Sequence, residues 1–278
     1  MKYLDDLIKI AINEDIGDGD HTSLACIPKN ANGKAHLLVK EKGVIAGVNL
    51  AATIFNKIDK NLKFIKNIED GTNVEIGDIV FTIEGSSQSI LKAERLVLNF
   101  MQRMSGIASN TNTYVNQLKG LKTQILDTRK TTPGLREIEK LAVKIGGGTN
   151  HRIGLYDMIM IKDNHIDYAG GIEKAIKSTQ NYLKENNKNL KIEIEARSLN
   201  ELSEILNVGG IHRIMLDNFS FDDMRTAVKQ IDGKYETEAS GGITLKTLRQ
   251  YAECGVDFIS VGALTHQINS IDLSLKAI

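Results

Sequence analysis

The spacing of hydrophobic residues predicts an α+β region in the first part of the chain. Residues 1–14 have the period of an amphipathic helix, whose apolar face comprises Leu4, Leu7, Ile8 and Ala11. Residues 35–40 then fit a strand, residues 50–58 a short helix, and the Gly-punctuated Val and Ile runs at 71–85 short antiparallel strands. The apolar stripe of a long helix follows at 92–118, and we expect this helix to lead into a second domain.

The pattern then changes to short apolar strands that alternate with helices. The expected strands are Gln124–Asp127, Met158–Lys162, Ile192–Ala196, Arg213–Asp217, Tyr235–Ser240 and Phe258–Gly262. The helices between them centre on Ile138–Ile145, Glu173–Leu183, Leu199–Leu206, Asp223–Ile231 and Leu245–Glu253. This alternation is typical of βαβ units, so we predict an α/β protein with domains at 1–110 and 111–278, in which the last residues could return to the first domain.

Polar or glycine residues end nearly every expected strand of the second domain. They are Asp127, Lys162, Glu195, Asp217, Ser240 and Gly262. In a β/α barrel such ends converge on one mouth, where substrates bind, whereas in an open sheet only those at the switch point meet. The pattern therefore favours a barrel over an open sheet.

The composition narrows the class of protein. Of 278 residues, 35 are Lys or Arg and 35 are Asp or Glu, and this zero net charge argues against nucleic-acid and membrane-surface partners. Cys26 and Cys254 lack neighbours at metal-ligand spacing, and we interpret them as small buried hydrophobes in a reducing compartment. The first residues lack the apolar core of a signal peptide and no stretch has the apolar length of a membrane span, so we expect a cytoplasmic protein.

The stretch from residue 127 to residue 152 carries the densest cluster of cationic side chains. We predict Thr132 as a helix N-cap, Pro133 as the first helical residue and Gly146 as the helix end. Arg129 and Lys130 would then precede a helix N-terminus, which favours anions.

On the other side of this predicted helix, His151 and Arg152 follow three glycines, a flexible loop that lets the backbone approach a ligand. The alternative is ordinary surface charge on two loops, but the four side chains together favour an anion site. The Arg136, Lys140 and Lys144 repeat on the helix itself fits a solvated face instead.

Two consecutive strands near the end of the chain are each followed by a Gly-containing turn, at residues 240–243 and 260–264. In β/α barrels the last two such turns commonly form a phosphate site from backbone N–H groups, and glycine keeps side-chain atoms away from the phosphate oxygens. Simple tight turns are the weaker interpretation.

Glu195 and Asp217 offer carboxylates at the expected barrel mouth. They could hold Mg²⁺, bind ribose hydroxyls or offset a developing positive charge, or they could form ion pairs with a neighbouring lysine. Lys162 could bind an anion or serve as the Schiff-base nucleophile of an aldolase-type barrel. The pattern leaves the role of His165 open and favours structural or exposed positions for the other histidines outside the anion site, which are His21, His36, His212 and His266.

Nine segments spread along the chain carry a resemblance to the quinolinate phosphoribosyltransferases, also called carboxylating nicotinate-nucleotide pyrophosphorylases. The segments are EDIGDGDHTS (14–23), ERLVLNFMQRMSGIAS (94–109), DTRKTTPGLR (127–136), GGGTNHRIGL (146–155), MIKDNHI (160–166), EIEAR (193–197), MLDNF (215–219), EASGGI (238–243) and SVGALTH (260–266). Because several of them are long and distinctive, the match is far more specific than any single Gly-rich loop.

The resemblance implies an N-terminal α+β sandwich followed by an incomplete β/α barrel of about seven strands. It implies a pentosyltransferase that combines quinolinate with 5-phosphoribosyl-1-pyrophosphate, using Mg²⁺, and yields nicotinate mononucleotide, pyrophosphate and CO₂ for NAD biosynthesis. It also implies a homodimer, in some members a hexamer, in which the N-terminal domain of one subunit covers the barrel mouth of the other.

The same resemblance assigns residues to substrates. Thr128, Arg129, His151 and Arg152 would surround quinolinate, joined by Arg95 from the partner subunit. Lys130 and Lys162 would lie between the dicarboxylate and the pyrophosphate, and Glu195 and Asp217 would bind ribose and Mg²⁺. These two lysines and two carboxylates are the expected catalytic residues. The 5-phosphate would bind at Ser240, Gly241, Gly242, Gly262 and Ala263.

Four alternatives stay open from the sequence. A related branch associated with molybdenum transport shares the barrel and several motifs, and a nicotinate phosphoribosyltransferase would need no decarboxylation. From other classes come the aldolase that uses Lys162 and a non-catalytic protein that binds phosphate metabolites. The density of arginines suits a dicarboxylate, because guanidinium groups pair with flat carboxylates in a bidentate manner.

Overall fold

A computed structural model describes residues 2–278, which divide into two compact units. The first unit comprises residues up to Thr113, Thr131–Gly147 and Ala263–Ile278, and the second comprises Tyr114–Lys130 and Gly148–Gly262. The chain therefore enters the second unit twice, at Tyr114 and at Gly148, and ends in the first unit.

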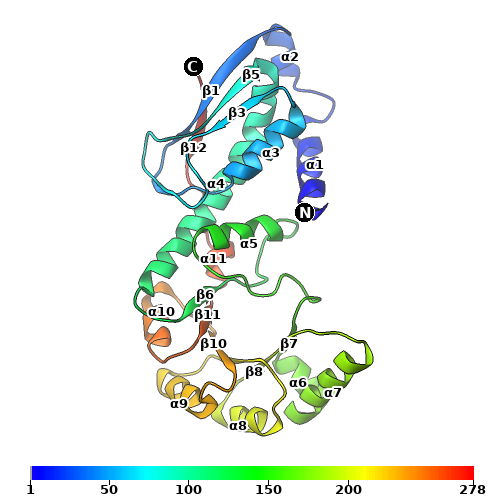
Figure 1. The fold of residues 1–278 in the computed structure, drawn as a ribbon, viewed down its shortest axis with the longest axis vertical. Coiled ribbons are helices and arrows are strands. Elements are labelled where there is room, and N and C mark those ends of the chain that lie inside the picture. Colours follow the sequence, from blue (N-terminus) through cyan, green and yellow to red (C-terminus); the bar gives the residue numbers. More distant parts are fainter. Residues whose placement is uncertain (1) are drawn as a thin grey trace. The chain divides into compact units, whose positions relative to one another are not determined.

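An antiparallel sheet with the strand order β12-β1-β5-β3 forms the centre of the first unit (Figure 1). Its strands are β1 (Asn32–Val39), β3 (Lys63–Lys66), β5 (Ile79–Ser86) and β12 (Leu273–Ala277), and a separate pair consists of β2 (Gly43–Val44) and β4 (Asn73–Val74). The C-terminal strand pairs with β1, with Ala35 opposite Ala277, so the two ends of the chain complete one sheet. The antiparallel strands expected between residues 71 and 85 are confirmed.

The helices of the first unit are α1 (Lys2–Ile16), α2 (His21–Cys26), α3 (Val48–Ile58), α5 (Arg136–Ile145), α11 (Ala263–His266) and most of α4 (Ser87–Gln117). The apolar stripe expected on α4 is buried, and Met101, Met104 and Ile107 are each at most 1% exposed. This stripe gives the long helix a continuous hydrophobic face, which accounts for its length in spite of several polar residues.

Six parallel strands in the order β6-β11-β10-β9-β8-β7 form the sheet of the second unit. They are β6 (Gln124–Leu126), β7 (Ile159–Ile161), β8 (Ile192–Ala196), β9 (Arg213–Asp217), β10 (Glu236–Ser240) and β11 (Phe258–Ser260). The connecting helices are α6 (Asp163–Ala169), α7 (Ile172–Glu185), α8 (Leu199–Val208), α9 (Phe221–Ile231) and α10 (Leu245–Ala252). The expected α/β class, with its parallel strand–helix alternation, is confirmed.

The sheet extends beyond β6 by a single parallel bridge between Leu126 and Thr149. The seventh strand of the expected barrel is thus reduced to one bridge, and β7 forms the other edge of the sheet. The second unit is therefore an incomplete barrel. The polar strand ends had suggested a closed ring, but no strand pairing closes it among the described residues.

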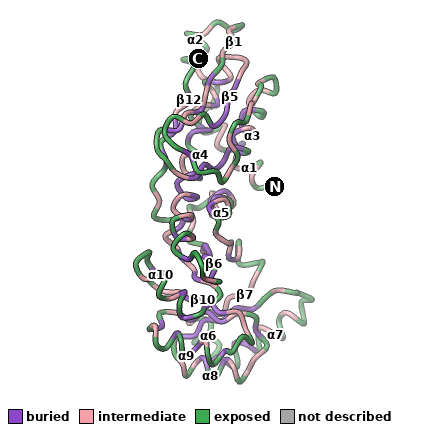
Figure 2. The backbone as a smooth tube through the Cα atoms, turned by 60° about the vertical axis from the view of Figure 1, so that its left-hand side comes forward, coloured by how far each residue is buried: buried purple, intermediate pink, exposed green. Residues whose placement is uncertain are grey.

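Both faces of this sheet are covered, as parallel sheets require. On the face toward the helices, Ile194, Ile214 and Ala239 are fully buried. On the opposite face of β8, Glu193 and Glu195 are also buried. Figure 2 shows buried backbone along the strands of the sheet and exposed backbone on α7, α8 and α9. The inner face of the sheet is therefore partly ionic.

Two predictions for α5 are wrong. The helix begins at Arg136 after Leu135, which makes no side-chain cap. Thr132 is therefore not the N-cap, Pro133 is not the first helical residue, and Arg129 does not directly precede a helix N-terminus. Lys140 is 1% exposed and not part of a solvated face. Its neighbour Glu139 is fully buried and accepts hydrogen bonds from Arg103, so the helix buries charged groups that the i, i+4 spacing placed in solvent.

The predicted end of α5 at Gly146 is confirmed. Of the two thiols, Cys254 is buried as expected, but Cys26 is exposed. None of the helices in residues 2–278 combines the length and the hydrophobicity that a membrane span requires.

Candidate active site

The parallel register brings the polar ends of the six strands to one rim of the sheet. Asp217 lies opposite Ser240, and Leu126 opposite Ser260. Around this rim, Thr128, Arg129 and Lys130 follow β6, Lys162 follows β7, Glu195 lies near the end of β8, Asp217 ends β9, Ser240 ends β10, and Gly262 follows β11. The fold thus collects the predicted site residues of the second unit at the end of the sheet where α/β proteins bind ligands.

The cationic side chains of the rim differ in exposure. Arg129, Lys130 and Lys162 are exposed, whereas Arg152 is half-buried. Burial and the nearby charge of Arg129 both lower the pKa of Arg152. The two guanidinium groups repel each other, and Arg152 is partly shielded from water. A bound anion would relieve this repulsion.

The loop that carries His151 and Arg152 is held by the buried side chain of Asp127. This carboxylate accepts hydrogen bonds from the His151 backbone N–H at 2.8 Å and from the Asn150 amide at 2.6 Å. Arg152 in turn donates from its guanidinium to the Met158 carbonyl at 3.1 Å. Asp127 therefore fixes the loop rather than facing a ligand.

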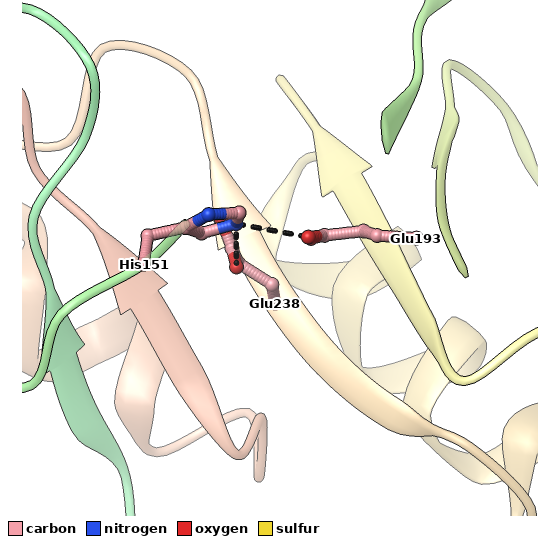
Figure 3. Close-up of side chains that lie close together, drawn as sticks. All are labelled: His151, Glu193 and Glu238. Carbon is pink, nitrogen blue, oxygen red and sulfur yellow. Dashed lines mark hydrogen bonds and ion pairs between the residues drawn. The ribbon is translucent and has the colours of Figure 1, made fainter. Parts of the chain in front are cut away.

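His151 itself is only 8% exposed, and its ring points between two glutamates (Figure 3). The Nε2 atom lies 2.9 Å from Glu193 and 3.4 Å from Glu238. Burial alone would lower the pKa of His151, but the hydrogen bonds and charges of Glu193 and Glu238 outweigh burial and raise it to about 9. The Arg152 backbone N–H donates to Nδ1 at 2.7 Å, which favours the tautomer that carries its proton on Nε2.

Glu193, Glu238 and Arg213 form a buried charge network that the sequence interpretation missed. Arg213 donates to Glu238 at 3.2 Å and lies over the Phe258 ring, 4.1 Å from its centroid. Burial and the charge of Glu238 raise the pKa of Glu193 to about 7. The sequence IEIEA contained a signal for this network. Alternate residues of a strand point to the same face, so Glu193 and Glu195 lie together on the inner face of a sheet that is covered on both sides.

His151, Glu193 and Glu238 are the one group of ligand-type side chains in residues 2–278 close enough together to surround a metal ion. Their charges are already balanced within the protein, because Arg213 and the His151 ring face the two carboxylates. This arrangement is that of an ionic core.

Glu195 and Asp217 differ from this core because they repel each other at the rim. Burial and the charge of Asp217 raise the pKa of Glu195, an effect that Lys162 opposes. Asp217 is half-buried and accepts a hydrogen bond from Asn218 at 2.5 Å. Two neighbouring carboxylates at the rim offer the oxygen donors that Mg²⁺ prefers, and a divalent cation would relieve their repulsion. The donor set therefore fits the predicted metal.

The turn after β10 has the backbone that the predicted phosphate site needs. Gly241 and Gly242 both have positive φ, at 97° and 58°. A Cβ on Gly241 would lie 2.8 Å from the backbone nitrogen of Asn218, whereas the space beside Gly242 is open. Within the described chain, the N–H groups of Gly241 and Gly242 form no backbone hydrogen bond, so they can receive an anionic oxygen.

The turn after β7 is organised by His165. Its Nδ1 accepts the backbone N–H of Lys162 at 2.9 Å, which caps the first turn of α6. Arg197 braces the same helix through Asp167 at 3.3 Å. His165 thus holds the backbone of Lys162, a role that the sequence left open.

A cavity of about 360 Å³ lies against β7, α6 and α7, and its lining includes Arg152, Met160 and His165. Arg152 is the only predicted site residue among its lining residues, so this cavity adjoins the rim but does not coincide with it. Two other predicted residues, Arg95 and Ala263, belong to the first unit, where Arg95 is exposed on α4.

The remaining histidines occupy the structural or exposed positions that were expected. His36 Nδ1 lies 2.9 Å from the Thr82 hydroxyl, and His212 Nδ1 accepts the Ile192 backbone N–H at 3.0 Å. His21 and His266 are exposed.

Comparison with known proteins gives one family over nearly the whole chain. Residues 20–105 match the quinolinate phosphoribosyl transferase N-terminal domain, and residues 107–276 match the C-terminal domain. A relative from Nicotiana tabacum named quinolinate phosphoribosyltransferase [decarboxylating] 1b is 45% identical over 97% of this chain and 81% of its own length. A probable carboxylating nicotinate-nucleotide pyrophosphorylase from Bacillus subtilis is 41% identical over 94% of this chain and 89% of its own.

Solved structures agree with this assignment. The nicotinate-nucleotide pyrophosphorylase from Francisella tularensis is 39% identical, covers 100% of this chain and 96% of its own, and superposes with a TM-score of 0.93. A human nicotinic acid phosphoribosyltransferase at 11% identity shares the fold alone. With both domain profiles matched in order and identity above 40% across both units, the chain belongs to the quinolinate phosphoribosyltransferase family.

Proposed function

We propose that this chain transfers a phosphoribosyl group from 5-phosphoribosyl-1-pyrophosphate to quinolinate, with loss of CO₂, to give nicotinate mononucleotide for NAD biosynthesis. The observation that carries the proposal is 45% identity over 97% of the chain to a relative named for the decarboxylating reaction. The rim of the sheet supports it independently, because it gathers cations for a polyanionic substrate pair.

The residues of the rim can be assigned to the two substrates by their chemistry. Arg129 and Arg152, whose charges interact, suit the two carboxylates of quinolinate, and His151 lies beside them. Lys130 follows β6 and Lys162 follows β7, and the ammonium groups of both suit the mobile oxygens of pyrophosphate. We assign the 5-phosphate to the amides of the turn at Ser240, Gly241 and Gly242, where both glycines have positive φ. The assignment of Gly262 and Ala263 to the same phosphate is carried over from the family resemblance.

In this mechanism the bond from ribose C1 to pyrophosphate breaks first, through an oxocarbenium-like state. Glu195 and Asp217 stabilise that positive charge from the rim, and the pyridine nitrogen of quinolinate attacks C1. The ring then carries a positive charge. The electron pair of the bond to the 2-carboxylate flows into this cationic ring as CO₂ leaves, and a proton takes its place, so no pyridoxal or thiamine group is needed.

Mg²⁺ would be held by Glu195 and Asp217, whose repulsion is the structural reason for the assignment. When bound, it would neutralise charge on the pyrophosphate leaving group. Lys162 interacts with Glu195 through its charge, so the same side chain can balance the carboxylate and reach an anion.

A homodimer with a shared site is part of the proposal, and Arg95 would contribute from the partner subunit. The segment after Arg152 supports association, because Leu155 and Tyr156 are 71% and 73% exposed and Ile153 is 38% exposed. Exposed apolar residues so close together in sequence mark interaction surfaces more often than isolated ones do. We propose a cytoplasmic location, although several plant relatives are named as chloroplastic or mitochondrial proteins.

The proposal is tested by offering the purified protein quinolinate or nicotinate, each with phosphoribosyl pyrophosphate and Mg²⁺. We expect nicotinate mononucleotide from quinolinate and little or none from nicotinate, because Arg129 and Arg152 are matched to two carboxylates. Equal turnover of nicotinate would instead assign the chain to a reaction without decarboxylation. Borohydride trapping of a substrate adduct at Lys162 would revive the aldolase alternative.

A further inference from the structure

A buried network of charged side chains connects the start of β9 with the predicted quinolinate site. Arg213 on β9 pairs with Glu238 on β10. Glu238 and Glu193 on β8 each lie against Nε2 of the His151 ring (Figure 3). Glu193, Glu238 and the loop of His151 come from three separate elements, so only the folded sheet brings them together.

The network has a cost that packing alone does not explain. Both glutamates are fully buried, and one oxygen of each, Oε1, has no hydrogen-bond partner. Apolar side chains of the same size would avoid this desolvation, and replacing buried ion networks by apolar groups is often stabilising. A network of this kind therefore points to a role beyond stability.

The role follows from what the His151 ring does at its other nitrogen. With Nε2 held by the two carboxylates, Nδ1 accepts the backbone N–H of Arg152 at 2.7 Å. The glutamates thus set the ring orientation, and the ring sets the backbone of the residue whose guanidinium is expected to bind quinolinate. This is the arrangement by which metal-binding and catalytic histidines are oriented through a carboxylate on their second nitrogen.

We propose that Glu193 and Glu238, held by Arg213, are positioning residues for quinolinate binding that act through His151 on Arg152. The inference rests on the proposed function, because Arg152 is taken to contact quinolinate. Neither glutamate touches substrate in this scheme. Their effect is specific to the dicarboxylate site and leaves the phosphoribosyl pyrophosphate site, at Glu195, Asp217 and the Gly241 turn, intact.

The test compares Glu238→Gln and Glu193→Gln with the matched control Glu236→Gln. Glu236 also accepts from Arg213, at 2.9 Å, but does not contact His151. We expect the first two variants to weaken quinolinate binding at least about tenfold, as expected for a lost charge-assisted hydrogen bond. The KM for phosphoribosyl pyrophosphate should stay within about twofold in all three variants, and Glu236→Gln should bind quinolinate normally.

Two further measurements separate positioning from simple destabilisation. The ¹⁵N resonances of the His151 ring, assigned with His151→Gln, should shift in Glu238→Gln and Glu193→Gln but not in Glu236→Gln. Glu238→Asp, which keeps the charge, should recover part of the affinity. Variants that fold cooperatively, keep wild-type quinolinate binding and leave the ring resonances unchanged would overturn the proposal, and so would equal losses for both substrates.

Quinolinate binding is measured calorimetrically, without turnover, so the two proposals fail in different ways. If the wild-type protein binds quinolinate but forms no product, the proposed function fails while the positioning test still gives an answer. If the wild-type protein forms product and the glutamate variants bind quinolinate normally, only the positioning proposal fails.

Discussion

The rim and the interior of the parallel sheet both carry charge, but they hold it in opposite ways. At the rim, Arg129 and Lys162 are exposed at the ends of strands, and Glu195 and Asp217 repel each other. In the interior, the carboxylate of Glu193 is fully buried against His151, and its charge is balanced within the protein. Charge that the protein balances itself maintains geometry, whereas like charges that repel each other at the rim, such as Arg129 with Arg152 and Glu195 with Asp217, are balanced by a ligand.

This comparison predicts that substitutions at the rim lose function without losing stability. Arg129→Ala should weaken quinolinate binding by about 2 to 5 kcal/mol, because a carboxylate of the substrate then lacks its partner. Thermal unfolding should be nearly unchanged, since the Arg129 side chain is exposed. Calorimetric titration with quinolinate checks the first expectation, and calorimetric scanning checks the second.

Arg225→Ala is the control for that prediction, because Arg225 is an exposed arginine of the same unit whose one ion pair among residues 2–278 is with its helix neighbour Asp222. It should leave quinolinate binding unchanged. Near-normal quinolinate affinity in Arg129→Ala would remove this residue from the site.

The opposite result is expected in the interior. Arg213→Met removes the cation that faces the buried Glu238, so the free energy of unfolding should fall by about 3 kcal/mol, as when one partner of a buried ion pair is lost. Denaturant unfolding of the purified variant measures this loss. Unchanged stability would mean that the interior charges are screened like those of the rim, and the contrast between the two regions would disappear.

The pH dependence of stability sharpens the same contrast. The pKa of His151 is raised from 6.5 to about 9, so its stabilisation is complete below pH 6.5 and is lost as the pH rises through 9. The pKa of Glu193 is raised from 4.5 to about 7, so its own contribution is lost between pH 4.5 and 7, below the range in which His151 titrates. The free energy of unfolding should therefore fall by on the order of 2 kcal/mol between pH 6.5 and 9.

His151→Gln should flatten this part of the stability profile, because it removes the group that titrates near pH 9. A flat profile in the wild-type protein would contradict the raised pKa of His151 and would mean that the ring stays neutral, with Nδ1 accepting the Arg152 backbone N–H at every pH. Urea unfolding at closely spaced pH values distinguishes the two cases.

The smallest effect on stability concerns the metal at the rim. Chelation with EDTA should abolish turnover and added Mg²⁺ should restore it, with thermal stability little changed, because Glu195 and Asp217 lie at the carboxyl ends of β8 and β9. Asp217→Asn should raise the Mg²⁺ concentration needed for half-maximal activity at least about tenfold. Full activity after exhaustive chelation would contradict the assignment of these carboxylates.

Much of the second unit could be predicted from the sequence, because strand–helix alternation is strongly patterned. The strands at Ile192–Ala196 and Arg213–Asp217 have the predicted bounds, and the others differ by one or two residues at an end. The polar strand ends then marked the rim, since a parallel sheet brings carboxyl ends to one edge whichever way it curves. Closure was not predictable, because the missing pairing beyond Thr149 depends on one short segment.

The errors share one cause, which is that charge in a sequence does not show where it is buried. Lys140 repeats with Arg136 and Lys144 at helical spacing, yet only Lys140 is covered by the rest of its unit. In the same way, Glu193 and Glu238 have the alternation of solvent-facing residues, and only the parallel sheet turns them inward. Thr132 fails as a cap because the helix begins only at Arg136 and the Thr132 hydroxyl accepts a hydrogen bond from Arg103 at 2.7 Å instead.

The central claim is that quinolinate loses its 2-carboxylate only after it has become linked to ribose. It is tested most directly by giving the purified protein quinolinate labelled with ¹³C in the 2-carboxylate. Labelled CO₂ should appear in equal amount to nicotinate mononucleotide, and only when phosphoribosyl pyrophosphate and Mg²⁺ are both present. Labelled CO₂ without phosphoribosyl pyrophosphate, or a nucleotide product that retains the label, would contradict the account.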